Sequence, residues 1–157
     1  MSSVQDYLHQ RSLRELEALR QKLSNKPSLC LQLDHWTSAQ ERSYVGILES
    51  HVDGKFHLCY NMLDFAVDPD HCSEITFCTV DSIRMGFGIK DSQICGAVGD
   101  ATNSMKRALR LISDALPESI PHLCFSHVLQ RALVTNYECV PEIQQLHWNN
   151  PHHCELC

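Results

Sequence analysis

The hydrophobic positions of the chain recur with two periods, one typical of helices and one typical of strands. Leu16, Leu19 and Leu23 lie three and four residues apart, which predicts an amphipathic helix from Val4 to Leu23. A short continuous apolar run over Ile94–Val98 is typical of a strand buried on both faces. In chain order, the pattern predicts a helix over 4–23, strands over 28–34, 43–52 and 55–65, a helix over 72–85, a strand over 94–98, a helix after 102, a strand over 122–125 and a helix over 128–137.

Glycine and aspartate mark several boundaries of these elements. Asp53-Gly54 separates two strand patterns and predicts a tight two-residue hairpin turn, so the first three strands should form an antiparallel meander. Gly86 and Gly88 should end the helix over 72–85. The later strands alternate with helices, as in β-α-β crossovers, so the predicted fold class is α/β with one mixed five-stranded sheet and helices on both faces. The residues expected on the apolar side of the helix over 72–85 are Ile75, Cys78 and Ile83.

The composition suits one domain with short extensions. The chain has 157 residues, of which 43% are hydrophobic, enough apolar material for one core. We expect an N-terminal helix and linker over 1–27, a folded domain over 28–140 and an irregular Cys/His-rich tail over 141–157. The first residues lack the apolar stretch of a secretory signal, and no run approaches the ~20 apolar residues of a membrane span. We therefore expect an intracellular protein with no membrane partner.

The charge is spread unevenly along the chain, and the number of cysteines is odd. The net charge of -6 argues against a nucleic-acid binder that is basic over its whole surface, although a local basic patch remains open. Residues 1–33 carry a net +2, residues 34–100 a net -7 and residues 101–157 a net -1, so the middle of the chain is acidic. Nine cysteines cannot all pair with one another, and we expect reduced thiols. The cysteines expected to pack as small hydrophobes are Cys30, Cys59, Cys78 and Cys95.

Two aspartates follow strands that we expect to be neighbours. Asp34 ends the first predicted strand, and Asp100 follows the fourth. If these strands pair, both carboxylates emerge at one edge of the sheet, about 4.8 Å apart from strand to strand. Such a pair repels unless a cation lies between the carboxylates, and Mg²⁺ or Mn²⁺ is held in this way in two-metal phosphoryl transfer. The simpler alternatives are a turn residue for Asp34 and, for Asp100, a residue that accepts free N–H groups at the start of the next helix.

Four short motifs follow one another over roughly residues 28–137. They are Asp34-His35-Trp36-Thr37-Ser38 with Ser43-Tyr44 and His51, His71 through Ile75, Gly99-Asp100-Ala101-Thr102-Asn103-Ser104-Met105, and Cys124-Phe125-Ser126-His127-Val128-Leu129-Gln130. Together they resemble the RNase H-like catalytic domain of hAT-superfamily transposases, with Gly99 in place of the family's Thr or Ser. The resemblance implies an RNase H-like fold with strand order 3-2-1-4-5, and it implies that Asp34 and Asp100 are the first two members of an Asp-Asp-Glu metal triad. It also implies that Trp36, Asn103, Cys124 and His127 stand near that site.

The sequence departs from the family's pattern at the third carboxylate. Glu138, Glu142 and Glu155 follow the last motif, but none stands in the context of the family's catalytic Glu. The family's N-terminal BED finger and C-terminal dimerising region are also without a match, as expected of a truncated or domesticated copy. We therefore expect a transposase-derived nuclear protein that binds DNA or a protein without catalysis. The alternatives are a metal-dependent transposase fragment whose Glu comes from another chain, and a non-functional transposon remnant.

Further Cys, His and basic residues suggest binding sites of lower specificity. Cys124-x-x-His127 has metal-like spacing but only two of the four ligands that zinc usually takes, and a buried thiol with a helix-capping histidine explains it more simply. Trp36 suits either a base-stacking role or a place in the core. A zinc site in the tail would use His152, His153, Cys154 and Cys157. The candidate phosphate contacts for DNA are Lys106, Arg107, Arg110, Arg11, Arg14 and Arg20, with a solvated helix face as the alternative.

Overall fold

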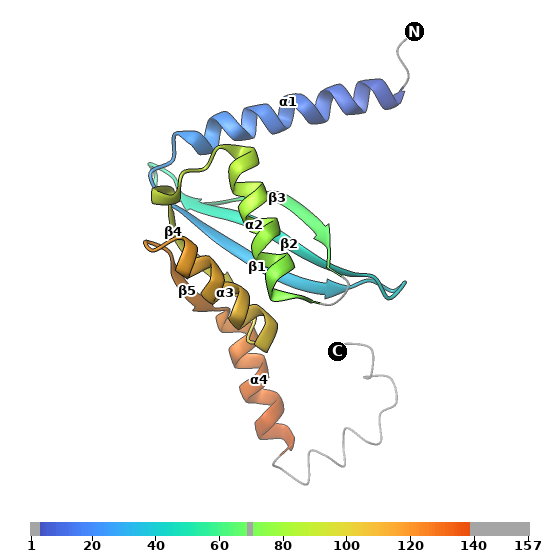
Figure 1. The fold of residues 1–157 in the computed structure, drawn as a ribbon, viewed down its shortest axis with the longest axis vertical. Helices are drawn as coiled ribbons and strands as arrows, with labels where there is room; N and C mark the ends of the chain where they lie inside the picture. The colour runs from blue at the N-terminus through green and yellow to red at the C-terminus, as the bar shows by residue number, and fades with distance from the viewer. Residues whose placement is uncertain (1–3, 69–70, 139–157) are drawn as a thin grey trace.

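A computed structural model of the chain describes residues 4–68 and 71–138 (Figure 1). Within these residues, four helices and a five-stranded sheet form the fold. The elements are α1 (Val4–Ser24), β1 (Leu29–Thr37), β2 (Ser43–Val52), β3 (Leu58–Val67), α2 (Ser73–Phe87), the short 3₁₀ helix η1 (Asp91–Gln93), β4 (Ile94–Gly99), α3 (Asn103–Ala115), β5 (Ile120–Leu123) and α4 (Phe125–Glu138).

The strand order of the sheet is β3-β2-β1-β4-β5, which confirms the predicted order and the α/β class. β1, β2 and β3 pair antiparallel, and β1, β4 and β5 pair parallel. The parallel half follows from the β4-α3-β5 crossover, because α3 must return the chain to the starting edge of the sheet. Thr102 caps α3, since its side chain accepts a hydrogen bond from the backbone N–H of Met105.

The core lies between the sheet and the helices α2 and α3. Leu31 and Leu33 of β1 both face inward and are at most 4% exposed. Figure 1 shows α2 and α3 across one face of the sheet, while α4 leads away from the end of β5. The prediction of helices on both faces therefore holds for one face within the described residues. The most deeply buried apolar side chains are Leu23, Leu29, Ile47, Ile94, Met105 and Ile112.

The β2–β3 hairpin is longer than the predicted two-residue turn. The Asp53 side chain accepts hydrogen bonds from the backbone N–H groups of Lys55 and His57, so it organises a wider loop. Phe56 in this loop has a φ of 63°. The third strand consequently begins at Leu58 rather than at Lys55.

The inward face of α2 differs from the prediction. Ser73, Thr76, Val80, Ile83 and Phe87 are its buried residues. Ile75 is 37% exposed and Cys78 is exposed, so neither belongs to the buried side of the helix. Gly88 ends the helix as predicted, with the left-handed φ of 67° that glycine adopts without strain, whereas Gly86 lies inside the helix, which continues to Phe87.

The terminal parts of the described chain make fewer contacts with the core. α1 confirms the predicted helix, but only its last turns pack, with Leu23 buried and Leu19 partly buried. Leu8 and Leu13 remain exposed. No helix within residues 4–68 and 71–138 is long and apolar enough to cross a membrane. The predicted tail over 141–157 lies outside the described residues.

Candidate functional site

The two predicted aspartates lie level with each other on neighbouring parallel strands. Gln32 of β1 pairs with Val98 of β4, and Asp34 and Asp100 follow two residues later on the two segments. Because side chains alternate along a strand, this register directs both carboxylates to the same face at the same edge of the sheet. Asp34 lies inside β1 rather than at its end, since β1 continues to pair with β2 as far as Thr37 after β4 has ended.

One carboxylate oxygen of Asp100 accepts hydrogen bonds in the turn before α3. Oδ1 accepts hydrogen bonds from the backbone N–H of Thr102 at 2.7 Å and from its hydroxyl at 2.6 Å. The residue is 9% exposed, whereas Asp34 is exposed. Both hydrogen bonds go to Oδ1, so Oδ2 is the oxygen that Asp100 can offer to a ligand. The capping role and a ligand role are therefore compatible.

A cavity of about 410 Å³ opens beside Asp100 and is closed on its other side by α4. Arg131 of α4 donates a hydrogen bond to the carbonyl oxygen of Ala101 at 2.8 Å, which fixes the guanidinium at this cavity. His127 also lines the cavity, and its buried Nδ1 has no hydrogen-bond partner in the described part of the chain. The remaining lining residues are Thr102, Gln130, Val134 and Thr135.

Cys124, directly before α4, is hydrogen-bonded through its backbone to the end of β4. Its backbone N–H donates to the carbonyl oxygen of Gly99 at 2.6 Å, so α4 starts directly beside the end of β4. Cys124 and His127 thus lie close to Asp100 in space. Asn103 is exposed as the first residue of α3. The Cβ of any larger residue at Gly99 would come within 2.6 Å of the Met105 sulfur, so Met105 fills the space at this position.

Trp36 belongs to an aromatic cluster on the same face as Asp34. Its ring stacks on Tyr44 with centroids 5.5 Å apart and lies 6.4 Å from the ring of Phe65. The indole covers Gly46, the residue that pairs with Asp34, because a Cβ there would lie 2.7 Å from the ring. Trp36 is 39% exposed, so it is neither a core residue nor a freely solvated one.

His35 is a buried residue of the site region that the sequence did not single out for a role. Its Nε2 lies 3.0 Å from the hydroxyl of Thr76 and 3.3 Å from a carboxylate oxygen of Asp68, which is fully buried. Its ring also meets that of His71 edge-on, with centroids 4.9 Å apart. These contacts tie the strand that carries Asp34 to the start of α2. Burial, and secondly the neighbouring His71, lower the pKa of His35 below its ordinary value of 6.5.

The lowered pKa of His35 predicts a loss of stability in mild acid. The unfolded chain takes up a proton at this residue near pH about 6.5 while the folded chain resists it, so the free energy of unfolding falls as the pH drops below that value. Urea unfolding at pH about 7.5 and about 5.5 measures the effect. We expect the decrease to be smaller in His35→Gln and unchanged in His9→Gln, whose side chain is exposed. An identical pH dependence in wild type and His35→Gln would contradict the assignment.

The candidate basic residues are partly occupied by ion pairs. Arg20 pairs with Glu17 at 3.2 Å, and Arg107 pairs with Glu74 at 2.5 Å. Hydrogen bonds from Ser73 and Cys72, together with Arg107, lower the pKa of Glu74 to about 2. Arg11, Arg14 and Arg110 are exposed and Lys106 is partly exposed, on two separate helices. A single basic surface is therefore not formed by these six residues.

The cysteines pack less than predicted. Cys30 and Cys59 are half-buried, but Cys78 and Cys95 are exposed, so the expectation of core packing is wrong for these two. Burial and the neighbouring Cys95 raise the pKa of the Cys30 thiol. Among the described side chains, no group of three or more His, Cys, Asp or Glu lies close enough to hold a metal ion. Glu138 is the last residue of α4, whereas Glu142, Glu155, His152, His153, Cys154 and Cys157 lie outside the described residues.

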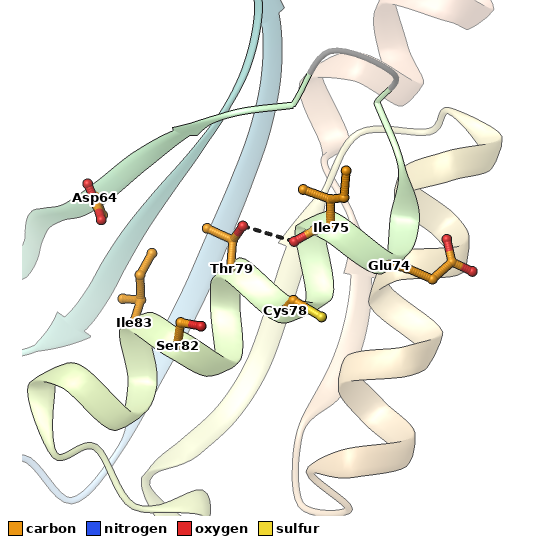
Figure 2. Close-up of a pocket in the computed structure, with 7 residues that line it drawn as sticks. All are labelled: Asp64, Glu74, Ile75, Cys78, Thr79, Ser82 and Ile83. Carbon is orange, nitrogen blue, oxygen red and sulfur yellow. Dashed lines mark hydrogen bonds between the residues drawn. The ribbon is translucent and has the colours of Figure 1, made fainter.

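A second cavity, of about 390 Å³, lies between α2 and β3 (Figure 2). Ile75, Cys78 and Thr79 of α2 border it, and Asp64 faces them from β3. The Thr79 hydroxyl is already bonded to the carbonyl oxygen of Ile75. Because this cavity is the more open of the two and its lining contains neither a guanidinium nor an imidazole, the cavity beside Asp100 is the better candidate for chemistry.

Comparison with known proteins leaves the site to be interpreted from its own chemistry. No protein-family model matches the chain, and no curated protein shows significant similarity to it. The function must therefore be argued from the aspartate pair, the cavity and the sequence motifs.

Proposed function

We propose that this chain is an RNase H-like domain derived from a hAT transposase, which binds DNA in the nucleus without cutting it. The support is the combination of the strand order β3-β2-β1-β4-β5 with motifs at the ends of β1, β4 and β5. Each motif alone has little specificity. Their order along the chain, together with the sheet on which they lie, gives the proposal its weight.

The main support is that Asp34 and Asp100 lie level on neighbouring strands, and that Asp100 lines a cavity together with Arg131 and His127. Carboxylates and a guanidinium that meet at the carboxyl edge of parallel strands suit a phosphate held together with a cation. The carboxylates alone would repel a phosphate, and Arg131 alone would bind it without fixing its orientation. Together they favour a phosphodiester as the ligand.

The two aspartates fit a single Mg²⁺ or Mn²⁺. Mg²⁺ is commonly bound by one or two carboxylates, and waters and phosphate oxygens complete its shell. Asp34 is exposed, and Oδ2 of Asp100 carries no hydrogen bond to the described residues. When bound, the ion would supply positive charge for a DNA phosphate between the two aspartates. Arg131 would neutralise the same phosphate from α4, and His127 Nδ1, which has no hydrogen-bond partner among the described residues, would face it from the same helix.

Binding without cleavage is the expected consequence of the two carboxylates that the described residues bring together at this edge of the sheet. In-line displacement at phosphorus needs attacking and leaving oxygens to be held by two ions about 3.5–4 Å apart. Asp34 and Asp100 supply ligands for one ion. We therefore propose that the domain uses the cation to hold DNA, so its biological role would be to occupy a DNA site or to bring a protein partner to it.

Binding of a fluorescent DNA duplex tests this proposal. We expect the dissociation constant to decrease at least about tenfold when Mg²⁺ replaces EDTA, and to rise with salt because phosphate contacts release counterions. In Asp34→Asn the effect of Mg²⁺ should disappear, since one carboxylate ligand is lost. Fluorescence anisotropy measures the constant in each condition.

Asp114→Asn is the matched control, because Asp114 is an exposed residue at the far end of α3. It should respond to Mg²⁺ as the wild type does.

The same affinity with and without Mg²⁺ in the wild type would contradict the proposal. Nicking of the duplex that is lost in Asp34→Asn would identify an active transposase fragment instead, and a broad, non-cooperative thermal melt would identify a non-functional remnant.

A further inference from the structure

The face of the sheet opposite α2 and α3 carries a large apolar patch. Successive side chains of β3 alternate, and those directed away from α2 lie level with the outward residues of β2. Trp36 of β1 extends the patch toward Asp34 through its stacking on Tyr44. Seven members of the patch are between 39% and 59% exposed: Trp36, Val52, Leu58, Tyr60, Met62, Phe65 and Val67. We call these seven residues the β2–β3 patch.

The size of the β2–β3 patch exceeds what a monomer usually exposes. At about half exposure, and with roughly 150–250 Å² for a large side chain, the seven residues present on the order of 700 Å². The largest apolar patch of a typical monomer is about 300–600 Å². A stable protein–protein interface takes about 800 Å² from each partner. The patch therefore has the area of one side of a standard interface.

The chemistry of the β2–β3 patch favours a second apolar surface and disfavours DNA. β1, β2 and β3 contain no lysine or arginine between their bounds, so phosphates find no cationic side chain on these strands. Their three charged residues are Asp34, Glu49 and Asp64. Glu49 is buried on the other face, and Asp64 borders the cavity beside α2 (Figure 2). The seven patch residues carry no charge themselves, and Asp34 lies beside them on the same face of the sheet.

We propose that two copies of this chain associate face to face through the β2–β3 patch. Such an interface is isologous, with the same residues buried in both copies, and it closes as a two-fold dimer. Sheets packed in this way interdigitate their side chains about 10 Å apart, as in the core of a β-sandwich. The aromatic side chains Trp36, Tyr60 and Phe65 supply the large rigid contacts that dominate protein interfaces.

The β2–β3 patch and the cavity beside Asp100 lie over different strands of the sheet. The β2–β3 patch occupies the β3 side of the sheet, whereas the cavity beside Asp100 lies at the β4–β5 side under α4. Trp36 marks the boundary between the two. The dimer therefore does not depend on the proposed DNA binding, and either can fail in experiment without the other.

Sedimentation velocity over a range of protein concentrations tests the dimer. We expect wild type to dimerise and Met62→Lys to raise the dimer dissociation constant at least about tenfold, because a lysine ammonium would be buried without a partner. Met85→Lys is the matched control: Met85 is 62% exposed on α2, away from the patch, and Met62 is 52% exposed. Circular dichroism verifies that both variants are folded. A monomeric wild type at all concentrations, or equal dissociation constants for the two variants, would overturn the proposal.

Tryptophan fluorescence locates the interface independently. The chain has two tryptophans, so Trp148→Phe leaves Trp36 as the reporter. We expect the emission of Trp36 to shift to shorter wavelength as the concentration rises and the dimer forms, since the indole leaves water. A dimer that forms without any change in Trp36 emission would place the interface elsewhere and refute the β2–β3 patch.

Discussion

Replacing Glu49 with alanine should lower the free energy of unfolding by about 1–3 kcal/mol, the cost of leaving a buried hydrogen-bonding group without its partner. Glu49 is fully buried and holds two partners on the same face of the sheet. One oxygen is hydrogen-bonded to His51 Nδ1, and the other accepts from the side-chain amide of Asn61 at 2.5 Å. Lys22 of α1 donates in turn to Asn61. Alanine would leave the imidazole and the amide buried without acceptors.

The second ring nitrogen of His51 increases the loss of stability expected for Glu49→Ala. Its Nε2 is already buried without a hydrogen-bond partner in the described residues, so the contact with Glu49 is the one it retains. Urea unfolding of Glu49→Ala measures the loss, with Glu118→Ala as a control because Glu118 is exposed. The control should remain within about 0.5 kcal/mol of wild type. A Glu49→Ala protein as stable as the control would show that the network contributes nothing.

Asn in place of Asp34 or Asp100 should weaken Mn²⁺ binding by roughly 10–100-fold, the range seen when groups that support a metal site are removed. Asparagine keeps the shape of aspartate and loses its charge. In Asp100→Asn the amide oxygen can still accept the two hydrogen bonds from Thr102, so the turn before α3 should persist. The effect should therefore be on the ion and not on the fold.

Calorimetric titration of the variants with Mn²⁺ provides the comparison. Asp114→Asn makes the same chemical change at an exposed position near the end of α3 and should bind Mn²⁺ as wild type does. The double variant Asp34→Asn/Asp100→Asn should lose little more than either single variant, because the two carboxylates share one ion. Losses that simply add would indicate two independent, nonspecific sites.

The order of the sheet was predictable because strongly periodic or continuous apolar segments form its centre. Leu31 and Leu33 alternate in β1, and the apolar run of β4 has no polar face to give to solvent. The boundaries were less predictable, since they depend on side chains acting locally. Asp53 widened the hairpin by accepting two backbone N–H groups, which the Asp-Gly pair alone does not reveal.

The buried polar side chains and their hydrogen-bond partners could not be predicted from the sequence. Thr76 is buried in α2 because Asp68 and His35 satisfy its hydroxyl, a partnership between segments far apart in the chain. Glu49 and His51 occupy inward positions of β2 because Asn61 lies opposite on β3. Because Thr76, Glu49 and His51 are polar, hydrophobic periodicity predicts that they face outward. Asp34 and Asp100 were identifiable because each follows or ends an apolar strand, a purely local signal.

Mn²⁺-induced broadening of backbone amide signals in an ¹⁵N–¹H NMR spectrum tests the central claim most directly, because the ion reports its own position. The account predicts that substoichiometric Mn²⁺ first broadens the amides of Asp34, His35, Asp100 and Ala101. The signals of the first turns of α1 and of the Asp53 loop should remain sharp. Broadening centred on another part of the chain, or the same broadening in Asp34→Asn, would contradict a cation site between Asp34 and Asp100.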